Sequence, residues 1–361
     1  MQGTSRVAVL YGPGDLRIES MPLPEVQADD GLLRVEATGV CGTDVAAYHG
    51  VNPYYELPTV LGHELVGVVE EIGDAAATRW GVQPGDRIVV EEYLPCGTCR
   101  SCLAGAYQMC IVPRYGGKSI HDRCGLYGGY ADYLYLHPQA IVHKVSKDVD
   151  ADLVQLYIPL SNGLHWASAV GALPIGGTAV IVGPGPHGQA CIIGALEAGA
   201  GQVIVIGRES DAHRLEVARK LGAHHTLTGD TAEVVEQVEE LTGGLLADTV
   251  INAADSSAAL ETAVSVAGDR STLVQVGLPK SGGGSAEPVL RALNSKVLTI
   301  RGVRGRPSSA VPPTLRLIES GRYPLDLLCT RQFPIEGTED ALVGSGRDPQ
   351  EIRCSVIPSL S

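Results

Sequence analysis

The chain has 361 residues, of which 44% are hydrophobic and 19% charged, a composition typical of a globular protein with two domains. Its formal net charge of −14 argues against nucleic acid or an anionic membrane surface as a partner. No N-terminal stretch resembles a signal peptide and no apolar run reaches the length of a membrane span, so we expect a cytoplasmic protein.

The first part of the chain is dominated by predicted strands. Alternating apolar residues, separated by Gly, Pro and Asp turns, predict strands at Val7–Leu10, Leu16–Glu19, Leu32–Thr38, Val66–Ile72 and Arg87–Val90. Few helical patterns interrupt them up to about residue 155. This half is therefore predicted to form a partly open β-barrel.

Four of the nine cysteines are clustered, namely Cys96, Cys99, Cys102 and Cys110. Their C-x2-C-x2-C-x7-C spacing can place four thiolates tetrahedrally around one zinc ion, with Gly97 and Gly105 allowing sharp turns. Because all four positions are protein ligands, a closed structural zinc site is predicted in a lobe at 93–113. Free thiols or two disulfides are the alternative, but clustered cysteines without an export signal favour metal.

Residues 178–206 have the pattern of a dinucleotide-binding unit. Thr178–Val182 predicts a buried strand, Gln189–Ala198 a helix and Gln202–Ile206 the next strand. A G-x-G-x-x-G motif joins the first strand to the helix, and its predicted cofactor-binding residues are Gly183, Gly185, His187 and Gly188. The glycines permit a tight turn, a close approach of a pyrophosphate and the packing of helix on strand. An ordinary glycine-rich turn is the alternative, but the flanking elements favour phosphate binding at the helix N-terminus.

The end of the second of these strands bears on the choice of cofactor. An NAD enzyme usually has an acidic residue here that binds the adenosine ribose, but this chain has Gly207 followed by Arg208. A guanidinium can bind a 2′-phosphate bidentately, and Arg214 could assist from the next helix. We therefore predict NADP. NAD remains the alternative, in which Arg208 is merely solvated and Glu209 acts as the acid.

The strand pattern continues in the second half of the chain. Ala247–Ala253, Thr272–Val276 and Val297–Val303 are predicted strands, and Gly277 ends the second of them where nicotinamide lies in such folds. Lys280–Ser285 is predicted to be a flexible loop because no strand leads into it and no helix follows at once. These elements predict a doubly wound α/β domain.

Two further motifs, Cys41-Gly42-Thr43-Asp44 and Gly62-His63-Glu64, precede the cysteine lobe and the glycine motif. In this order the motifs resemble the zinc-containing alcohol dehydrogenases of the medium-chain dehydrogenase/reductase superfamily. The resemblance covers nearly the whole chain, including the stretches Gly128–Ala131 and Thr299–Gly302.

The resemblance implies a GroES-like catalytic domain made from residues 1–157 and 301–361. A Rossmann domain at 158–300 would be inserted between these parts. In the family the strand at Val297–Val303 is an edge strand that pairs across a dimer axis, so a homodimer or homotetramer is expected.

The resemblance also implies a second, catalytic zinc bound by Cys41 and His63, a thiolate and an imidazole that suit this metal. In the family, Asp44 supports the metal-bound histidine from behind and fixes its tautomer. Thr43 hydrogen-bonds the substrate oxygen and begins a proton relay.

This chain departs from the family at the third ligand of that zinc. The matching position is Ile158, which cannot bind zinc. Glu64 is the expected substitute because it directly follows His63, and a weak, partly occupied site is predicted. Less favoured candidates are His121, Cys124, Asp152 and His165. Ala46 stands at the relay-histidine position, and His49, three residues further on, is not assigned that role.

These features predict a pyridine-nucleotide oxidoreductase acting on a small alcohol or carbonyl compound. Zinc would polarise the oxygen while a hydride passes between substrate carbon and nicotinamide. Ile158 and Ala46 favour an alternative, a zinc-free reductase of a polarised C=C or C=N bond. A non-catalytic nucleotide-binding protein is a third reading, against which the presence of Cys41, Thr43 and His63 speaks.

Overall fold

The structure is a computed structural model that describes residues 3–51, 55–110, 114–277 and 286–360. It contains two compact units. The first combines Met1–Ile158 with Pro307–Ser361, and the second is the continuous segment Pro159–Arg306. Among the described residues, no helix is long and apolar enough to cross a membrane.

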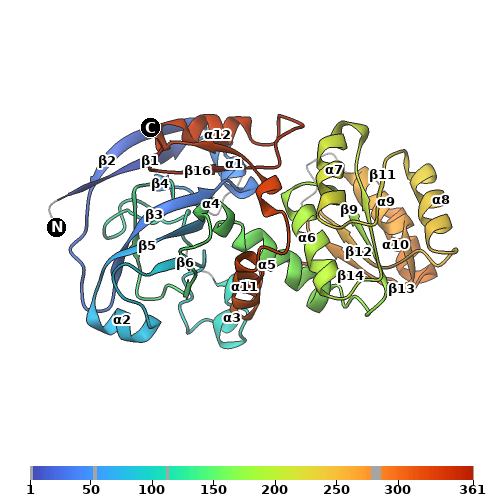
Figure 1. Cartoon of the computed structure of the whole chain (residues 1–361), viewed down its shortest axis with the longest axis horizontal. Coiled ribbons are helices and arrows are strands. Elements are labelled where there is room, and N and C mark those ends of the chain that lie inside the picture. Colours follow the sequence, from blue (N-terminus) through green and yellow to red (C-terminus); the bar gives the residue numbers. More distant parts are fainter. Residues whose placement is uncertain (1–2, 52–54, 111–113, 278–285, 361) are drawn as a thin grey trace. The chain divides into compact units, whose positions relative to one another are not determined.

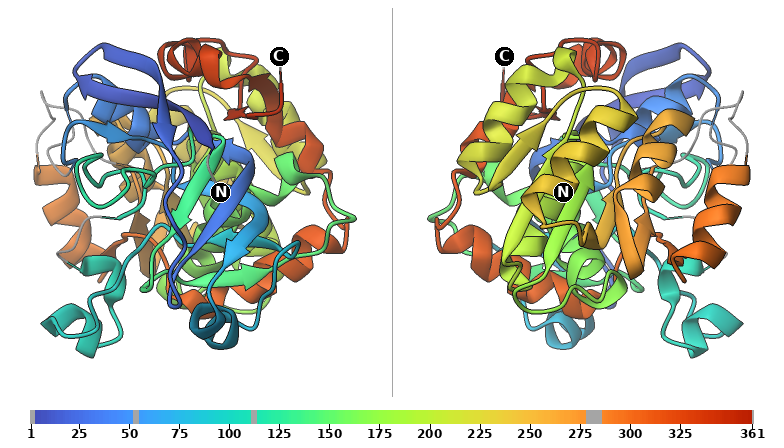
Figure 2. Two further views of the ribbon diagram at one scale, coloured as in Figure 1. Left: turned by 90° about the vertical axis from the view of Figure 1, so that its left-hand side faces the viewer. Right: turned by 90° about the vertical axis from the view of Figure 1, so that its right-hand side faces the viewer.

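The first unit is built mainly from strands (Figure 1; Figure 2, left). They are β1 (Thr4–Gly12), β2 (Asp15–Pro22), β3 (Gly31–Gly39), β4 (Thr59–Val60), β5 (Glu64–Ile72), β6 (Arg87–Val90), β7 (Tyr133–Leu136), β8 (Val142–Lys144), β15 (Cys329–Phe333) and β16 (Arg353–Val356). One sheet has the order β2-β1-β4 and the other the order β15-β16-β3-β5-β6-β8, with β7 also paired to β3. All five strands predicted for the first part of the chain lie within observed strands, which confirms the β-rich prediction.

Short helices connect and flank these strands. They are α1 (Gly42–Tyr48), α2 (Asp74–Trp80), α3 (Arg100–Leu103), α4 (Ala151–Val154), α11 (Val311–Glu319) and α12 (Thr338–Gly344). A further helix, α5 (Tyr157–His165), runs across the boundary between the units.

The register of three strands brings distant parts of the chain together at one point. Gly39, at the end of β3, pairs with Glu64 at the start of β5 on one side and with Ser355 of β16 on the other. Cys41 lies two residues after the end of β3, and His63 immediately precedes β5. This junction therefore holds both motifs on which the predicted catalytic site depends.

The second unit has a six-stranded parallel sheet in the order β11-β10-β9-β12-β13-β14. Its strands are β9 (Thr178–Val182), β10 (Gln202–Ile206), β11 (His225–Leu227), β12 (Ala247–Asn252), β13 (Ala267–Gln275) and β14 (Thr299–Gly302). Its helices are α6 (Pro186–Glu197), α7 (Ala212–Lys220), α8 (Thr231–Leu241), α9 (Ser257–Ser265) and α10 (Glu287–Ser295). Figure 1 shows α6 and α7 on one face of the sheet and α8, α9 and α10 on the other, and Figure 2 (right) shows the helices from the side.

This arrangement confirms the predicted doubly wound fold, and β9 and β10 have the predicted boundaries. β13 begins five residues earlier than predicted, because its pairing with β12 shifts register and accommodates Asp269 and Arg270. β14 is one of the two edge strands of this sheet. The predicted loop Lys280–Ser285 lies outside the described residues.

Candidate active site and metal centres

The four lobe cysteines are arranged as the ligands of a tetrahedral metal site. Two of their sulfur–sulfur distances, Cys96 to Cys102 and Cys99 to Cys110, are both 3.9 Å. A tetrahedron with zinc–sulfur distances of about 2.3 Å has edges of about 3.8 Å. All four thiols are free, so neither disulfide considered above is present.

Backbone groups in the lobe support thiolates. The amide of Cys99 donates to the sulfur of Cys96, and that of Cys102 donates to the sulfur of Cys99. The amides of Thr98 and Cys99 lower the pKa of Cys96 to about 6, which favours the form that binds zinc. Gly97 and Gly105 have φ values of +74° and +75°, as the predicted sharp turns require.

A tyrosine ties the lobe to the barrel. The hydroxyl of Tyr107 donates to Glu91, at 2.7 Å, and its ring meets that of Tyr93 edge to face. The fully buried Glu91 also contacts His143 at 2.8 Å and accepts a hydrogen bond from Ser308 at 2.6 Å. The conformation of the cysteine lobe is therefore linked to the packing of the barrel through Glu91.

The second candidate centre lies at the junction of β3, β5 and β16. A sulfur of Cys41, a ring nitrogen of His63 and a carboxylate oxygen of Glu64 all lie within 4.8 Å of one another. Ile158 is buried and offers only hydrocarbon. Among the residues that the structure describes, this trio and the lobe are the only such metal-ligand groups, so the less favoured candidates for the third ligand are not part of one.

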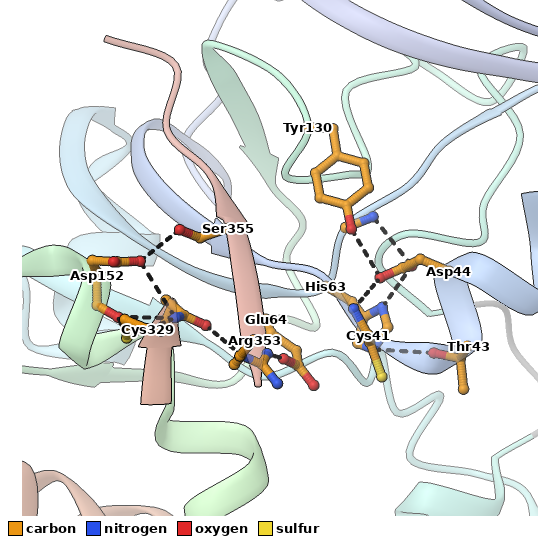
Figure 3. A network of polar contacts seen from close by, with 12 residues as sticks. Cys41, Thr43, Asp44, His63, Glu64, Tyr130, Asp152, Cys329, Arg353 and Ser355 are labelled. Atoms are coloured by element: carbon orange, nitrogen blue, oxygen red, sulfur yellow. Dashed lines mark hydrogen bonds and ion pairs between the residues drawn. The ribbon is translucent and has the colours of Figure 1, made fainter. Parts of the chain in front are cut away.

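Asp44 determines which nitrogen of His63 is available (Figure 3). Its carboxylate faces Nδ1 of His63 at 3.2 Å and accepts a hydrogen bond from Tyr130, at 3.1 Å. Burial raises the pKa of Asp44, but the positive charge and hydrogen bond of His63 lower this pKa by more. The net shift is downward, so the carboxylate is ionised. Nε2 of His63 is thereby left for a metal, 3.5 Å from the hydroxyl of Thr43.

The two carboxylate oxygens of Glu64 differ in the same way: one faces a neighbouring side chain and the other is available to a metal. Its Oε2 forms an ion pair with Arg353, whereas the buried Oε1 has no hydrogen-bond partner among the described residues. Burial raises the pKa of the Cys41 thiol, but His63 lowers it to about 7. A thiolate, an imidazole and an orphaned carboxylate oxygen fit a zinc ion.

Sequence reasoning missed Arg353 and Tyr130 as parts of this site. Arg353 begins the short strand β16 (Arg353–Val356), whose other residues are apolar or small, and its side chain is only 4% exposed. An arginine in such a strand signals a buried acidic partner. No comparable signal marks Tyr130.

In the second unit, the glycine motif forms a tight turn between β9 and α6. Gly183 has a φ of +97°, and a Cβ at Gly188 would overlap the carbonyl oxygen of Gly183. A Cβ at Gly185 would meet nothing within 4 Å, so this backbone is open to a ligand. His187 packs against Trp166 with ring centroids 5.2 Å apart, and burial lowers its pKa to about 4, which keeps it neutral.

The end of β10 is packed closely and carries two arginines around one acid. A Cβ at Gly207 would lie 3.0 Å from Pro184, so the usual acidic side chain has little room. Asp211 accepts hydrogen bonds from the main chain and side chain of Arg208 and lies 3.5 Å from Arg214. Glu209, the alternative acid, is exposed. Asp211 was not predicted.

Gly277 lies just after β13. A Cβ there would overlap the carbonyl oxygen of Ala254, so only glycine fits without a shift of the backbone. Its own carbonyl accepts a hydrogen bond from Gln275, at 2.6 Å, and Gln275 in turn accepts one from Asn252. The backbone at this end of the sheet is therefore held in place.

Comparisons with known proteins agree with both units. Residues 27–147 match the family described as Alcohol dehydrogenase GroES-like domain, and residues 186–320 match Zinc-binding dehydrogenase. A Mycobacterium tuberculosis protein named probable alcohol dehydrogenase is 36% identical over 345 residues, 93% of each chain. The erythritol/L-threitol dehydrogenase of Mycolicibacterium smegmatis is 32% identical over 371 residues, 98% of each chain. A protein of Sinorhizobium meliloti assigned as a zinc-binding dehydrogenase, solved with NADP, is 25% identical with a TM-score of 0.84, covering 99% of this chain and 100% of that one.

The chain therefore belongs to the zinc-containing alcohol dehydrogenases of the medium-chain dehydrogenase/reductase superfamily. Membership confirms the predicted resemblance, the fold class and the prediction of an NAD(P)-dependent oxidoreductase. The non-catalytic reading is not supported.

Proposed function

We propose that this enzyme oxidises a secondary hydroxyl of a small polyol with NADP, assisted by zinc bound to Cys41, His63 and Glu64. The orphaned Oε1 of Glu64 is the observation that carries the proposal. It supplies a third ligand atom where Ile158 cannot, and it leaves one tetrahedral position open for substrate.

Each residue of the site has a separate task in this reaction. When bound, zinc supplies a Lewis acid for the substrate oxygen and nicotinamide supplies the hydride acceptor. Asp44 holds His63 with Nε2 directed at the metal position. Oγ1 of Thr43 would take the proton of the substrate hydroxyl while releasing its own. Ala46 carries no acceptor and His49 is exposed, so we expect the released proton to pass to solvent.

A loop that packs against His63 carries polar side chains that would suit a hydroxyl-rich substrate. Gly116 packs directly against His63, and two residues earlier Arg114 lies 3.5 Å from the hydroxyl of Tyr55. Burial lowers the pKa of Arg114, but Tyr55, Tyr93 and Glu92 raise it well above its usual range, so it remains charged. Guanidinium, carboxylate and phenol groups together can donate to and accept from several hydroxyls.

A substrate panel tests this proposal. We expect oxidation of four- to six-carbon polyols with NADP to exceed that of simple monohydric alcohols. Arg114→Met should raise KM for polyols by about tenfold, the loss of one charge-assisted hydrogen bond, with little change for a monohydric alcohol. Turnover of enones but of no alcohol, in protein that holds the lobe zinc alone, would favour the zinc-free reductase instead.

The cofactor preference is expected to depend on Arg208. Its side chain is 79% exposed, and both Arg208 and Arg214 lie beside Asp211, so guanidinium groups are at hand for a 2′-phosphate. Arg208→Ala should weaken NADPH binding by about 10–100-fold and NADH binding by less than about twofold. Titration of both cofactors by fluorescence measures this. The matched control is Arg219→Ala, which removes an arginine of α7 that pairs with Glu216. Equal affinity of the unaltered enzyme for both cofactors would contradict the preference.

A further inference from the structure

Buried polar contacts continue from Glu64 away from the metal position (Figure 3). Beyond Glu64 lies Arg353, whose Nε donates to Oε1 of Gln155 at 3.0 Å. Gln155 is fully buried. These contacts join β5, β16 and the segment that follows α4.

The orientation of Gln155 is fixed by Asp152. The amide nitrogen of Gln155 donates to the main-chain oxygen of Asp152 at 2.9 Å, so its oxygen must face Arg353. The carboxylate of Asp152 is itself held by Ser355 at 2.6 Å and by Gln332 at 2.8 Å. Hydrogen bonds therefore fix the orientation of Arg353, Gln155 and Asp152 in turn.

Gly39 leaves the space in which these side chains meet. A Cβ at this position of β3 would overlap both the guanidinium of Arg353 and the amide oxygen of Gln155. The contact between Arg353 and Gln155 therefore depends on a glycine in the central strand.

The contact with Gln155 restricts how Arg353 can bind Glu64. A guanidinium prefers to bind a carboxylate with two parallel hydrogen bonds, for example through Nε and Nη2. Because Nε is occupied by Gln155, this edge cannot take both oxygens of Glu64. Nη2 of Arg353 then contacts Oε2 alone, and Oε1 has neither an ion pair nor a hydrogen bond with any described residue.

We propose that Gln155, oriented by Asp152, is a positioning residue for the inner metal site: by occupying Nε of Arg353 it keeps Oε1 of Glu64 available as the third zinc ligand. This inference rests on the proposed function, in which that zinc is bound. Since Ile158 supplies no ligand, the site has no protein ligand to spare.

Zinc retention distinguishes this role from a merely structural one. Gln155→Leu frees Nε of Arg353 to take both oxygens of Glu64. We expect the inner zinc to be lost to a chelator about 10–100-fold more readily, while the lobe zinc stays, so that zinc falls from two ions per subunit to one. Thr338→Val, which removes another buried hydrogen bond of the same unit, is the control and should retain both ions.

The double variant Gln155→Leu/Arg353→Met provides the decisive comparison. If capture of Oε1 by the guanidinium causes the loss, removal of the guanidinium should restore zinc retention. If the series only stabilises the fold, the double variant should be worse than either single variant. Unchanged retention in Gln155→Leu, or no recovery in the double variant, would overturn the inference. Wild-type enzyme with the lobe zinc alone would overturn the proposed function, and this inference with it.

Discussion

Replacement of Glu64 by glutamine is expected to remove the inner zinc and lower kcat by about 100-fold or more, while the lobe zinc remains. A neutral amide is a poor zinc ligand, and only Cys41 and His63 would be left. Its oxygen can still accept from Arg353, which limits the cost of an unpaired buried guanidinium. Zinc per subunit and steady-state kinetics on a polyol measure the result.

A second variant separates loss of the ligand from loss of the fold. Cys41→Ala leaves the pair of Glu64 and Arg353 intact and should lose the same zinc ion. If Glu64→Gln instead keeps two zinc ions and turns over substrate within about twofold of the wild-type rate, Glu64 is not a ligand.

Replacement of Cys99 by serine is expected to destabilise the first unit before it affects the chemistry. Loss of one of four ligands releases the lobe zinc, and metal binding contributes directly to folding in such sites. Because Tyr107 joins the lobe to Glu91 of the barrel, the effect should extend beyond the lobe. We expect Tm to fall by roughly 5–10 °C, measured by calorimetry.

The control for this change is the same substitution at Cys124, which lies outside both metal groups. Cys124→Ser should keep both zinc ions and most of the thermal stability. An unchanged Tm in zinc-free Cys99→Ser protein would show that the lobe contributes nothing to the stability of the barrel.

The features that could be predicted from the sequence are those formed by residues that are close together along the chain. Thr178–Val182 and the glycines that follow it occupy one short segment, and the lobe cysteines another. Hydrophobic period and motif spacing describe such segments well, which is why β9 and β10 have the predicted boundaries.

The missed residues act through contacts between distant segments. Arg353 reaches Glu64 only because β16 and β5 both pair with β3. Gln155 has no motif around it, and its role depends on which of its amide atoms faces Arg353. Asp211 binds Arg208, only three residues away, but the sequence does not distinguish an aspartate that accepts such a capping hydrogen bond from one that is solvated. Pairing of side chains across strands requires the register, which the pattern of one strand does not contain.

The two metal sites differ in how far apart their residues lie along the chain. The lobe ligands fall between residues 96 and 110, so this site can assemble as soon as that segment has left the ribosome. The inner site takes its ligands from Cys41, His63 and Glu64, but Arg353 of β16, the ion-pair partner of Glu64, is translated long after them. A nascent chain can therefore carry its first zinc ion well before the second site has its final geometry.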